Sequence, residues 1–333
     1  MVRTVAVLLA GGTGTRLYPA SRSDRPKQFQ SFGADSRSLL RRAADRAAFA
    51  DDVCVLTREA YADAVREHVP EADVLVEPVA KDTGPALAYA SHRVREEHAD
   101  AVLCALPADH VVGDGFGEVA RRGCRVAAER EKLVTFGVEP DRPATEYGYI
   151  EPGAAHDGYA DVASFREKPD AETAARLREA GCLWNAGLFA WRPEVFLAEA
   201  RDGPLAPLID ALDAGDPERG FDRVDPVSVD YAVMERTDRA AVVPADFDWD
   251  DLGSWDALER VLDGDGDGNT LASDALALDA SGNVIASDDK HVSVVGVDDL
   301  VVAAYDDRVL VVPKADGQRV RDVVAELRGD DLF

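Results

Sequence analysis

The chain has 333 residues, 46% of them hydrophobic, and its 64 acidic and 37 basic residues give a formal net charge of −27. This hydrophobic content supports a core, so disorder driven by charge is excluded. The negative charge argues against general affinity for nucleic acid or anionic membranes, although a local basic pocket could still bind a phosphate. The length indicates roughly two domains, or one large α/β domain with an appendage.

The charged residues have an unusual composition, because only six of the 37 basic residues are lysines. A carboxylate-rich surface suits a high-salt cytoplasm, where salt screens self-repulsion, so we favour a halophilic protein over an acidic mesophilic one. The four scattered cysteines include no C-x-x-C pair, which argues against a zinc site or a disulfide framework. No stretch approaches the ~18 apolar residues that span a bilayer. We therefore expect a cytoplasmic protein with no membrane or nucleic-acid partner.

Short apolar runs alternate with longer helical patterns through the first half of the chain. The runs predict strands at Thr4 to Leu9, Val53 to Thr57, Asp73 to Glu77, Ala101 to Leu106 and Leu133 to Val138. The helical patterns cover Ser38 to Phe49, Glu59 to His68, Gly84 to His98 and Gly115 to Arg130. This alternation predicts an α/β fold with a mainly parallel sheet covered on both faces, whose ligands bind at the carboxyl ends of the strands.

The second half begins with strands around one helix at Ala171 to Ala180, and helical stretches follow at Glu194 to Ala200 and Trp255 to Leu262. The turn-rich segment GDGDGN, Gly264 to Asn269, is the expected boundary between domains at residues 1–263 and 264–333. The last part is predicted to hold evenly spaced valine-rich strands, which suit a small β-solenoid or sheet appendage, and a terminal helix: Asn283 to Ala286, Val292 to Val297, Leu300 to Ala304, Val309 to Val312 and Asp316 to Arg328.

The glycine-rich loop after the first strand is the first candidate site. Gly11, Gly12 and Gly14 allow backbone amides to approach a ligand, and Arg16 and Lys27 add cationic donors. The loop is not a Walker P-loop, because no Gly-Lys-Ser/Thr follows, and it lacks the third glycine of a dinucleotide fingerprint. A triphosphate is the expected ligand.

Two acidic motifs are further candidate sites. Asp109 follows a strand in LPADH and is placed to ligate a divalent cation, although a turn or helix-capping role is an equal alternative. Asp250 and Asp251 lie between Trp249 and Trp255, and this apolar setting distinguishes them from the many other aspartates.

Two further motifs suit a sugar phosphate. The pair Glu167 and Lys168 in FREKP could bind a sugar hydroxyl and a phosphate together, and the alternative is a surface ion pair worth under ~1 kcal/mol. Asn185 in the segment WNAG carries an amide suited to hydroxyl recognition, and the alternative there is a buried aromatic residue beside a turn.

Together these motifs resemble one family, the mannose-1-phosphate guanylyltransferases within the sugar-nucleotide pyrophosphorylases. The resemblance covers nearly the whole chain, in the family's order: LLAGGTGTRLYPASR with PKQF, EPVAKDTGPA, LPADHVV, TFGVEPDRPATEYGYI, FREKPD, LWNAGLFAW, SVDYAVMER and WDDLGSWDAL. It implies a Rossmann-like, GT-A-like nucleotidyltransferase domain with a small left-handed β-helix-like appendage.

The resemblance also assigns roles to individual residues. Arg16, Lys27 and Lys168 would be catalytic through the phosphates that they bind, and Asp109 and Asp251 would carry Mg²⁺ or Mn²⁺. Glu77 would lie near the base, where a carboxylate can accept from guanine N1–H and N2–H₂. The nucleotide-binding set is Leu9, Ala10, Gly11, Gly12, Gly14, Thr15, Glu77, Thr83, Gly84, Pro107 and Asp109, and the sugar-binding set is Gly148, Glu167, Asn185 and Gly187.

The expected reaction makes GDP-mannose and pyrophosphate from GTP and α-D-mannose 1-phosphate, by in-line attack on the α-phosphorus. One alternative is the same chemistry with glucose 1-phosphate and dTTP or UTP. The other is a non-catalytic sugar-nucleotide-binding regulatory protein. The family further implies a homodimer.

The segment Asp263 to Asp274 also matches the front of an EF-hand calcium loop. An aspartate at its twelfth position is a weaker ligand than glutamate, and no helix is predicted to follow, so we favour an acidic linker.

Overall fold

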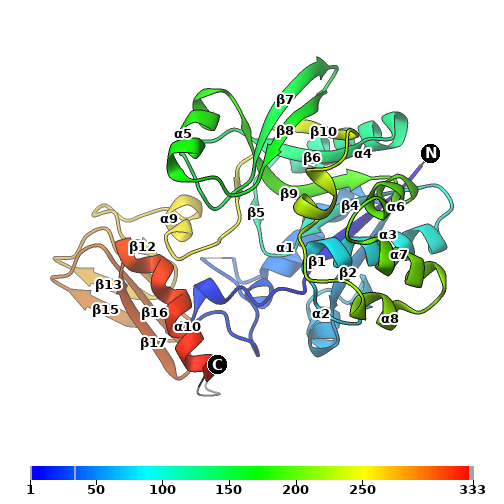
Figure 1. Ribbon diagram of the computed structural model, residues 1–333. Coiled ribbons are helices and arrows are strands. Elements are labelled where there is room, and N and C mark those ends of the chain that lie inside the picture. Colours follow the sequence, from blue (N-terminus) through cyan, green and yellow to red (C-terminus); the bar gives the residue numbers. More distant parts are fainter. Residues whose placement is uncertain (1, 34, 330–333) are drawn as a thin grey trace. The chain divides into compact units, whose positions relative to one another are not determined.

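The structure is a computed structural model that describes residues 2–33 and 35–329. Its residues group into two compact units, which are described separately (Figure 1). Unit 1 comprises the residues up to 11, 43–107 and 112–249, and unit 2 comprises 12–42, 108–111 and the residues from 250 onward. The predicted boundary at residues 263 and 264 stays a prediction.

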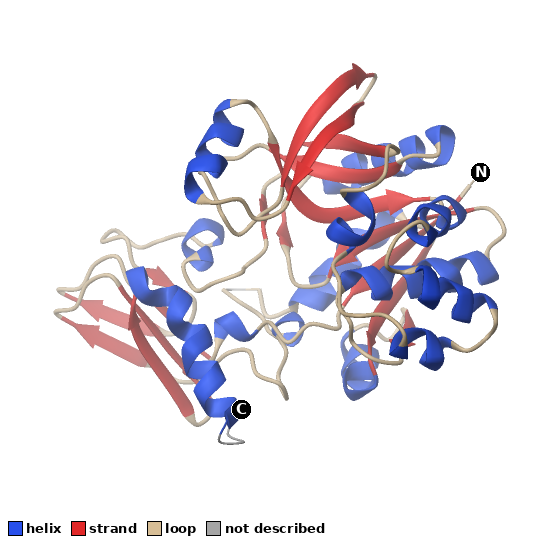
Figure 2. Ribbon diagram, in the orientation of Figure 1, coloured by secondary structure: helices blue, strands red, loops and turns tan. Residues whose placement is uncertain are grey.

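Unit 1 is built on a nine-stranded mixed sheet with the order β3-β2-β1-β4-β9-β6-β10-β8-β7 (Figure 2). Its strands are β1 (Arg3–Leu9), β2 (Asp52–Arg58), β3 (Asp73–Glu77), β4 (Ala101–Pro107), β6 (Leu133–Val138), β7 (Tyr149–His156), β8 (Tyr159–Arg166), β9 (Leu183–Trp191) and β10 (Ala240–Ala245). Strands β3, β2, β1 and β4 are mutually parallel, whereas β9 runs antiparallel to both β4 and β6. The parallel arrangement is therefore concentrated in the half formed by the first strands, as their alternation with helices predicted.

The register of the parallel strands brings their carboxyl ends to one edge. Leu9 at the end of β1 lies opposite Leu56 on one side and Pro107 on the other, and Arg58 pairs with Glu77. This edge is where open α/β sheets bind ligands.

Helices cover both faces of the sheet. The helices of unit 1 are α2 (Ala62–His68), α3 (Thr83–Glu97), α4 (Phe116–Arg130), α5 (Ala171–Glu179), α6 (Pro193–Arg201), α7 (Ala206–Asp213) and α8 (Pro217–Asp222), with a π-helical turn at Asp230–Met234. Leu103 of β4 belongs to the core beneath α3, α6 and α7, whereas its neighbour Cys104 contacts Cys124 on α4. Because successive side chains of a strand point to opposite faces, α3 and α4 lie on opposite sides. None of the described helices is long and apolar enough to cross a membrane.

Three short elements occur where the chain passes from one set of residues to the other. They are α1 (Leu39–Arg46), β5 (Val111–Val112) and β11 (Trp249–Asp250), and the two strands pair as a separate ladder.

Unit 2 contains a small C-terminal module of short, mostly parallel strands at residues 270–313, the β-helix module. In chain order, the elements of the whole unit are the 3-10 turns η1 (Thr15–Leu17) and η2 (Lys27–Phe29), α9 (Ala257–Val261), β12 (Thr270–Leu271), β13 (Ala275–Leu278), β14 (Val284–Ser287), β15 (Val292–Val295), β16 (Leu300–Tyr305), β17 (Arg308–Pro313), η6 (Lys314–Arg319) and α10 (Val320–Gly329). Strands β12, β14 and β16 are stacked in parallel, and β13 pairs with β15 in the same way, which is the arrangement of a β-helix. Buried asparagines connect its layers, because Asn283 Nδ2 donates to Asn269 Oδ1 at 2.9 Å.

The core of unit 2 joins sequence-distant residues. Leu17, Tyr18 and Phe32 from the N-terminal region pack with Trp255 and with valines of the β-helix module such as Val301. The segment that carries the glycine loop is thus part of the same hydrophobic core as the C-terminal strands.

Candidate active site

Two glycines of the loop in unit 2, Gly14 and Gly12, have different surroundings. Gly14 adopts a positive φ of 63°, and a Cβ there would come within 2.5 Å of Lys27 Cβ, so only glycine fits. Gly12 is exposed, and a Cβ there would meet nothing within 4 Å. The backbone at Gly12 is therefore open to a ligand, while Gly14 lets Lys27 pack against the loop.

Lys27 is the central cation of this region. Its side chain is only 5% exposed, and its Nζ donates to Asp109 Oδ2 at 2.9 Å and to the backbone carbonyl of Asp251 at 2.5 Å. The structure thus brings the two predicted metal-binding aspartates to one ammonium group, although they are far apart in the sequence.

The surroundings of Asp109 favour its ionised form. Loss of solvent opposes ionisation, but the positive charge of Lys27, with a contribution from His110, outweighs it and holds the pKa of Asp109 below its usual value. Asp109 is therefore a carboxylate at neutral pH, as a metal ligand must be.

The adjacent aspartates Asp250 and Asp251 have different environments. Asp250 is buried, and both of its oxygens accept hydrogen bonds, from Arg260 Nε at 2.6 Å and from Leu252 N at 2.8 Å. Asp251 Oδ1 accepts from Gly253 N at 3.0 Å, within its own turn. Asp250 thus serves the fold, and Asp251 is the better candidate ligand of the pair.

The carboxylates of Asp109 and Asp251 have the chemistry of magnesium ligands. Mg²⁺ takes oxygen ligands and is usually bound by one or two carboxylates together with water and substrate phosphates. Within the described ranges, no group of three or more His, Cys, Asp or Glu residues is arranged to hold a metal. The Lys27 ammonium contacts the carboxylate of Asp109 and the main-chain carbonyl of Asp251, so oxygen atoms of both residues stabilise positive charge.

Arg16 lies on η1, beside Thr15, at the end of the glycine loop. Its side chain is exposed, and it forms no ion pair with any residue in 2–33 or 35–329. An exposed guanidinium on the same loop as Lys27 is available to an anionic ligand.

Glu77 in unit 1 is a buried carboxyl beside the start of the glycine loop. It is 6% exposed, Oε1 lies 2.9 Å from where a Cβ of Gly11 would be, and Oε2 has no hydrogen-bond partner among the described residues. Burial raises the pKa of Glu77 to about 7, against the opposing attraction of Arg58. A buried polar atom without a partner is costly, which is the pattern expected where a ligand completes the contact.

Other residues predicted to bind the nucleotide have structural partners. Ala10 O accepts from Thr57 Oγ1 at 3.0 Å, which fixes the end of β1. Thr83 Oγ1 accepts from Val229 N at 3.0 Å, and a Cβ on Gly84 would come within 2.6 Å of Val227 O. Thr83 and Gly84 therefore hold the start of α3 against the segment before the π-helical turn.

The four predicted sugar-binding residues lie together in unit 1. Asn185 N donates to Gly148 O at 2.8 Å, and Asn185 Oδ1 accepts from Gly187 N at 3.2 Å and from Thr135 Oγ1 at 2.8 Å. A Cβ on Gly148 would come within 2.5 Å of Glu167 Oε2. These contacts orient Asn185 and leave one of its Nδ2 hydrogens for a ligand.

Asp230 is a member of this cluster that the sequence analysis did not single out. Its Oδ1 accepts the other hydrogen from Asn185 Nδ2 at 2.9 Å. Burial, together with the negative charge of Glu167, raises the pKa of Asp230 to about 7. The motif SVDYAVMER was recognised, but one more aspartate in an acidic chain carries no signal of its own.

Lys168 lies next to this cluster with its side chain 60% exposed, and it pairs with the buried carboxylate of Glu167. Its backbone has a positive φ of 42°, which is uncommon for a residue other than glycine. The Glu167–Lys168 pair thus combines a buried acceptor with an exposed cation.

The fold and the candidate site are those of one class of protein, the α/β nucleotidyl transferases. A family model described as "Nucleotidyl transferase" matches residues 5–267, and one described as "MannoseP isomerase/GMP-like beta-helix domain" matches residues 273–327.

Curated relatives narrow this class. The chain is 35% identical to the mannose-1-phosphate guanylyltransferase of Sinorhizobium fredii (strain NBRC 101917 / NGR234), over 99% of this chain and 69% of the relative. It is 37% identical to the mannose-1-phosphate guanylyltransferase of Escherichia coli, over 97% of this chain and 73% of the relative.

A solved structure agrees with these relatives. The crystal structure of the mannose-1-phosphate geranyltransferase from Thermus thermophilus superposes with a TM-score of 0.92 at 35% identity, covering 98% of this chain and 99% of that one. The chain therefore belongs to the nucleotidyl transferase family, in the group that contains the mannose-1-phosphate guanylyltransferases. The predicted family and fold class are confirmed.

Proposed function

We propose that the protein joins GTP and α-D-mannose 1-phosphate to give GDP-mannose and pyrophosphate. The observation that carries the proposal is the contact of Lys27 with Asp109 and Asp251. Lys27 lies on the same loop as the exposed Arg16. The names of the relatives supply the substrates.

The reaction is a direct displacement. A phosphate oxygen of mannose 1-phosphate attacks the α-phosphorus of GTP, and the bond from that phosphorus to the oxygen bridging to the β-phosphate breaks. Pyrophosphate leaves with the bonding electron pair. The attacking phosphate is already anionic, so no protein nucleophile or general base is required. The protein contributes alignment and charge neutralisation.

Charge neutralisation falls to the cations. Arg16 and Lys27 bind the phosphates of GTP, and Lys168 binds the phosphate of the sugar. Asp109 and Asp251 would hold Mg²⁺ or Mn²⁺, which when bound neutralises charge on the transferring phosphate.

Three residues account for the choice of substrates, one for the base and two for the sugar. Glu77 accepts hydrogen bonds from N1–H and N2–H₂ of guanine through its unpartnered, buried oxygen. Glu167 and the remaining Nδ2 hydrogen of Asn185 bind sugar hydroxyls. Asp230 holds Asn185 in the orientation that presents this hydrogen.

A substrate panel tests the proposal. GTP, UTP and dTTP are each combined with mannose 1-phosphate and glucose 1-phosphate, and pyrophosphate release is measured. We expect GTP with mannose 1-phosphate to have the highest kcat/KM. A preference for glucose 1-phosphate with UTP or dTTP would favour the rival specificity, and binding without turnover by any pair would favour a regulatory protein.

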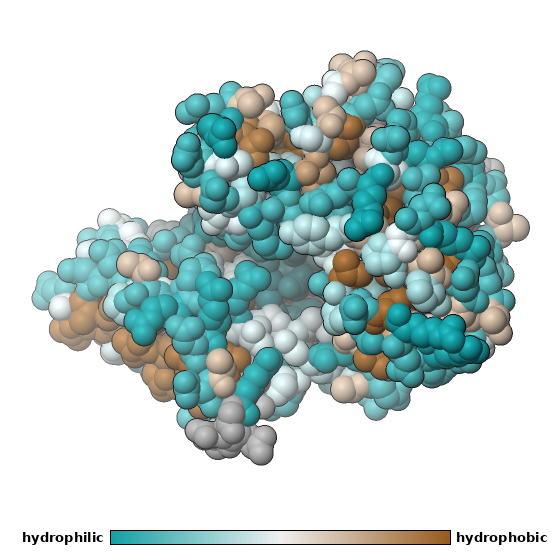
Figure 3. Space-filling model, in the orientation of Figure 1, coloured by the Kyte–Doolittle hydropathy of each residue, from teal (hydrophilic) through white to brown (hydrophobic). Residues whose placement is uncertain are grey.

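We also propose that two copies associate through the C-terminal module and act in the cytoplasm. Apolar side chains on the outer faces of β13, β15 and β17 are exposed, and Figure 3 shows hydrophobic surface over this module: Leu276, Leu278, Val295, Val309 and Val311. Exposed apolar patches mark interaction sites. Replacing Val309 and Val311 by glutamate should convert a dimer into a monomer in light scattering, and an unchanged mass would contradict this interface.

All four cysteines are free, in keeping with a reducing compartment.

A further inference from the structure

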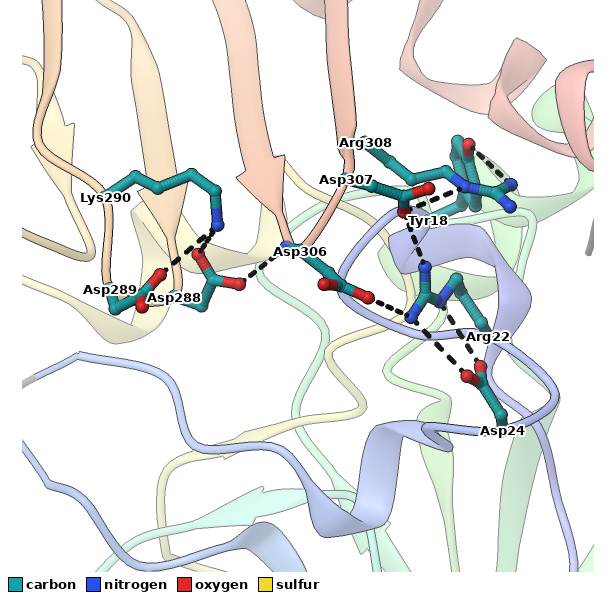
Figure 4. Close-up of polar contacts among 9 residues, drawn as sticks. All are labelled: Tyr18, Arg22, Asp24, Asp288, Asp289, Lys290, Asp306, Asp307 and Arg308. Atoms are coloured by element: carbon teal, nitrogen blue, oxygen red, sulfur yellow. Dashed lines mark hydrogen bonds and ion pairs between the residues drawn. The ribbon is translucent and has the colours of Figure 1, made fainter.

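Arg22 lies at the centre of an ion-pair cluster in unit 2 that the proposed reaction does not use. Although it is charged, its residue is only 6% exposed. Its guanidinium lies 3.3 Å from Asp24, 3.1 Å from Asp306 and 3.4 Å from Asp307 (Figure 4). A mostly buried guanidinium surrounded by three carboxylates is strongly held in place.

Two of these acids form the tight turn between β16 and β17. Tyr305 pairs with Arg308 across the turn, and Asp306 has a positive φ of 53°. Asp306 N donates to Asp288 Oδ2 at 2.6 Å, which ties the turn to the preceding layer of the module. The position of Asp306 and Asp307 is therefore set by the β-helix module itself.

A second contact connects the same turn to the same N-terminal segment. Arg308 Nη1 donates to the hydroxyl of Tyr18 at 3.4 Å (Figure 4). The Tyr18 carbonyl also accepts from Trp255 Nε1 at 3.0 Å. The segment from Tyr18 to Arg22 is thus held to the module at both of its ends.

This segment is also bonded to the glycine loop. Ser21, next to Arg22, donates from Oγ to the Thr13 carbonyl, and Ser21 N donates to Leu17 O at 3.1 Å. Gln28 Nε2 donates to Gly12 O at 3.0 Å. Any displacement of Arg22 would therefore be transmitted to the backbone between Gly12 and Arg16.

We propose that Arg22 is a positioning residue for the triphosphate of the nucleotide, and that the turn Asp306–Arg308 of the C-terminal module is the clamp that holds it. The module then contributes to the binding of GTP and pyrophosphate indirectly, by positioning the loop that carries Arg16 and Lys27. This inference rests on the proposed function, since it assumes that the loop binds the nucleotide.

The test uses full-length variants in which one side of the clamp is changed. The double variant Asp306→Asn and Asp307→Asn removes two of the three charges facing Arg22, those that the turn supplies, and leaves Asp24 in place. It keeps the size of both side chains, which are largely exposed. We expect the KM for GTP, and that for pyrophosphate in the reverse direction, to rise about tenfold, because a mispositioned loop loses ground-state phosphate contacts. The KM for mannose 1-phosphate should stay within about twofold.

Two further variants separate positioning from general stability. Arg22→Leu should raise the KM for GTP as strongly, and Arg22→Lys, which keeps the charge, should recover part of the loss. Asp274→Asn is the matched control, because it removes a module carboxylate that pairs with His291 and does not contact the loop. It should leave the KM for GTP unchanged.

The outcomes are distinguishable from failure of the proposed function. If the wild-type protein does not turn over GTP and mannose 1-phosphate, the function itself is wrong. If it does, but the clamp variants have the control's KM for GTP, the inference about Arg22 is overturned. It is equally overturned if the KM values of both substrates change together and in proportion to a lowered melting temperature.

Discussion

At the scale of single residues, the two contacts of Lys27 differ in kind. Its ammonium bonds to the carboxylate of Asp109 but only to the backbone carbonyl of Asp251. The Asp251 side chain is therefore not required to hold Lys27. Asp251→Asn should lower kcat about 100-fold or more, as expected when a charged group that acts on the transition state is removed. The melting temperature should hardly change.

Asp250→Asn is the matched control for Asp251→Asn. Its carboxylate is buried and pairs with Arg260, so this variant should lower the free energy of unfolding by about 1–2 kcal/mol and leave kcat near the wild-type value well below its melting temperature. Activity assays at saturating Mg²⁺ together with thermal melts measure both effects. Near-normal kcat for Asp251→Asn would contradict the metal role of this residue.

On the proposed function, the buried carboxyl of Glu77 should make binding of GTP pH-dependent. Because its pKa is raised to about 7, the group is protonated below pH 7 and ionised above it. Only the ionised form accepts from both guanine donors, so kcat/KM for GTP should rise with pH through about 7.

Glu77→Gln identifies the group responsible, because glutamine does not titrate. This step in the pH profile should be absent in the variant, whereas any contribution of Asp230, with its similarly raised pKa, remains. Titration of GTP itself is the same in both enzymes and cancels in the comparison. Identical profiles of variant and wild type would show that Glu77 does not control binding.

At the scale of structural elements, two glycines of the glycine loop are expected to have different roles. Gly14 is required by the backbone conformation, and Gly12 leaves room for a ligand. Gly14→Ala should lower the free energy of unfolding by about 1–2 kcal/mol or more, since alanine is strained at this positive φ and would clash with Lys27. Gly12→Ala meets no protein atom, so it should leave the melting temperature unchanged and raise the KM for GTP. An unchanged KM for Gly12→Ala would mean that the nucleotide does not approach this backbone.

The elements with simple patterns could be predicted from the sequence. The strands at Asp73–Glu77 and Leu133–Val138 were predicted with their observed limits, because apolar β-branched runs bounded by turns have few alternatives. Helices α7 and α8 and strand β10 were missed. Both helices are short and contain proline near their start, and β10 contains Pro244, which argues against a central strand.

Several predicted elements are shorter in the structure than expected. Strand β15 ends at Val295 rather than Val297, because Gly296 adopts a positive φ. The predicted helix at Trp255 to Leu262 is limited to Ala257–Val261, and α10 begins only at Val320, after a 3-10 turn.

The sequence motifs located most residues of the candidate site. They did not indicate the contacts between these residues, because those contacts join parts of the chain that are far apart in the sequence. The resemblance located Asp109, Asp251 and Lys27. That both aspartates contact the Lys27 ammonium depends on long-range packing, which no local pattern encodes. For the same reason no motif indicated the contacts of Asp230 or the clamp on Arg22. The acidic segment before β13 forms a turn in which Asp265 Oδ1 accepts from Asn269 N at 2.8 Å, and a strand rather than a helix follows.

At the scale of the whole molecule, the net charge of −27 remains to be tested as a salt adaptation. The repulsion among excess carboxylates is screened within a few ångströms at molar salt, so the melting temperature should rise continuously from about 0.1 M to molar KCl. Sucrose at matched osmolality serves as a control for general stabilisation by excluded solutes. A melting temperature that is flat or falls with KCl would contradict the halophilic interpretation.

The division of unit 2 into three separate stretches of chain has a consequence for biosynthesis. Residues 12–42 leave the ribosome early, but most of their hydrophobic partners lie beyond residue 250. The glycine loop therefore cannot pack into its hydrophobic core until the C-terminal strands have been made, and such late, non-local contacts form slowly. A nascent chain can form much of the sheet of unit 1 before this point, but Lys27 gains its contact with Asp251 only near the end of translation. The order of synthesis thus means that unfinished chains lack the contacts that complete the proposed phosphate site.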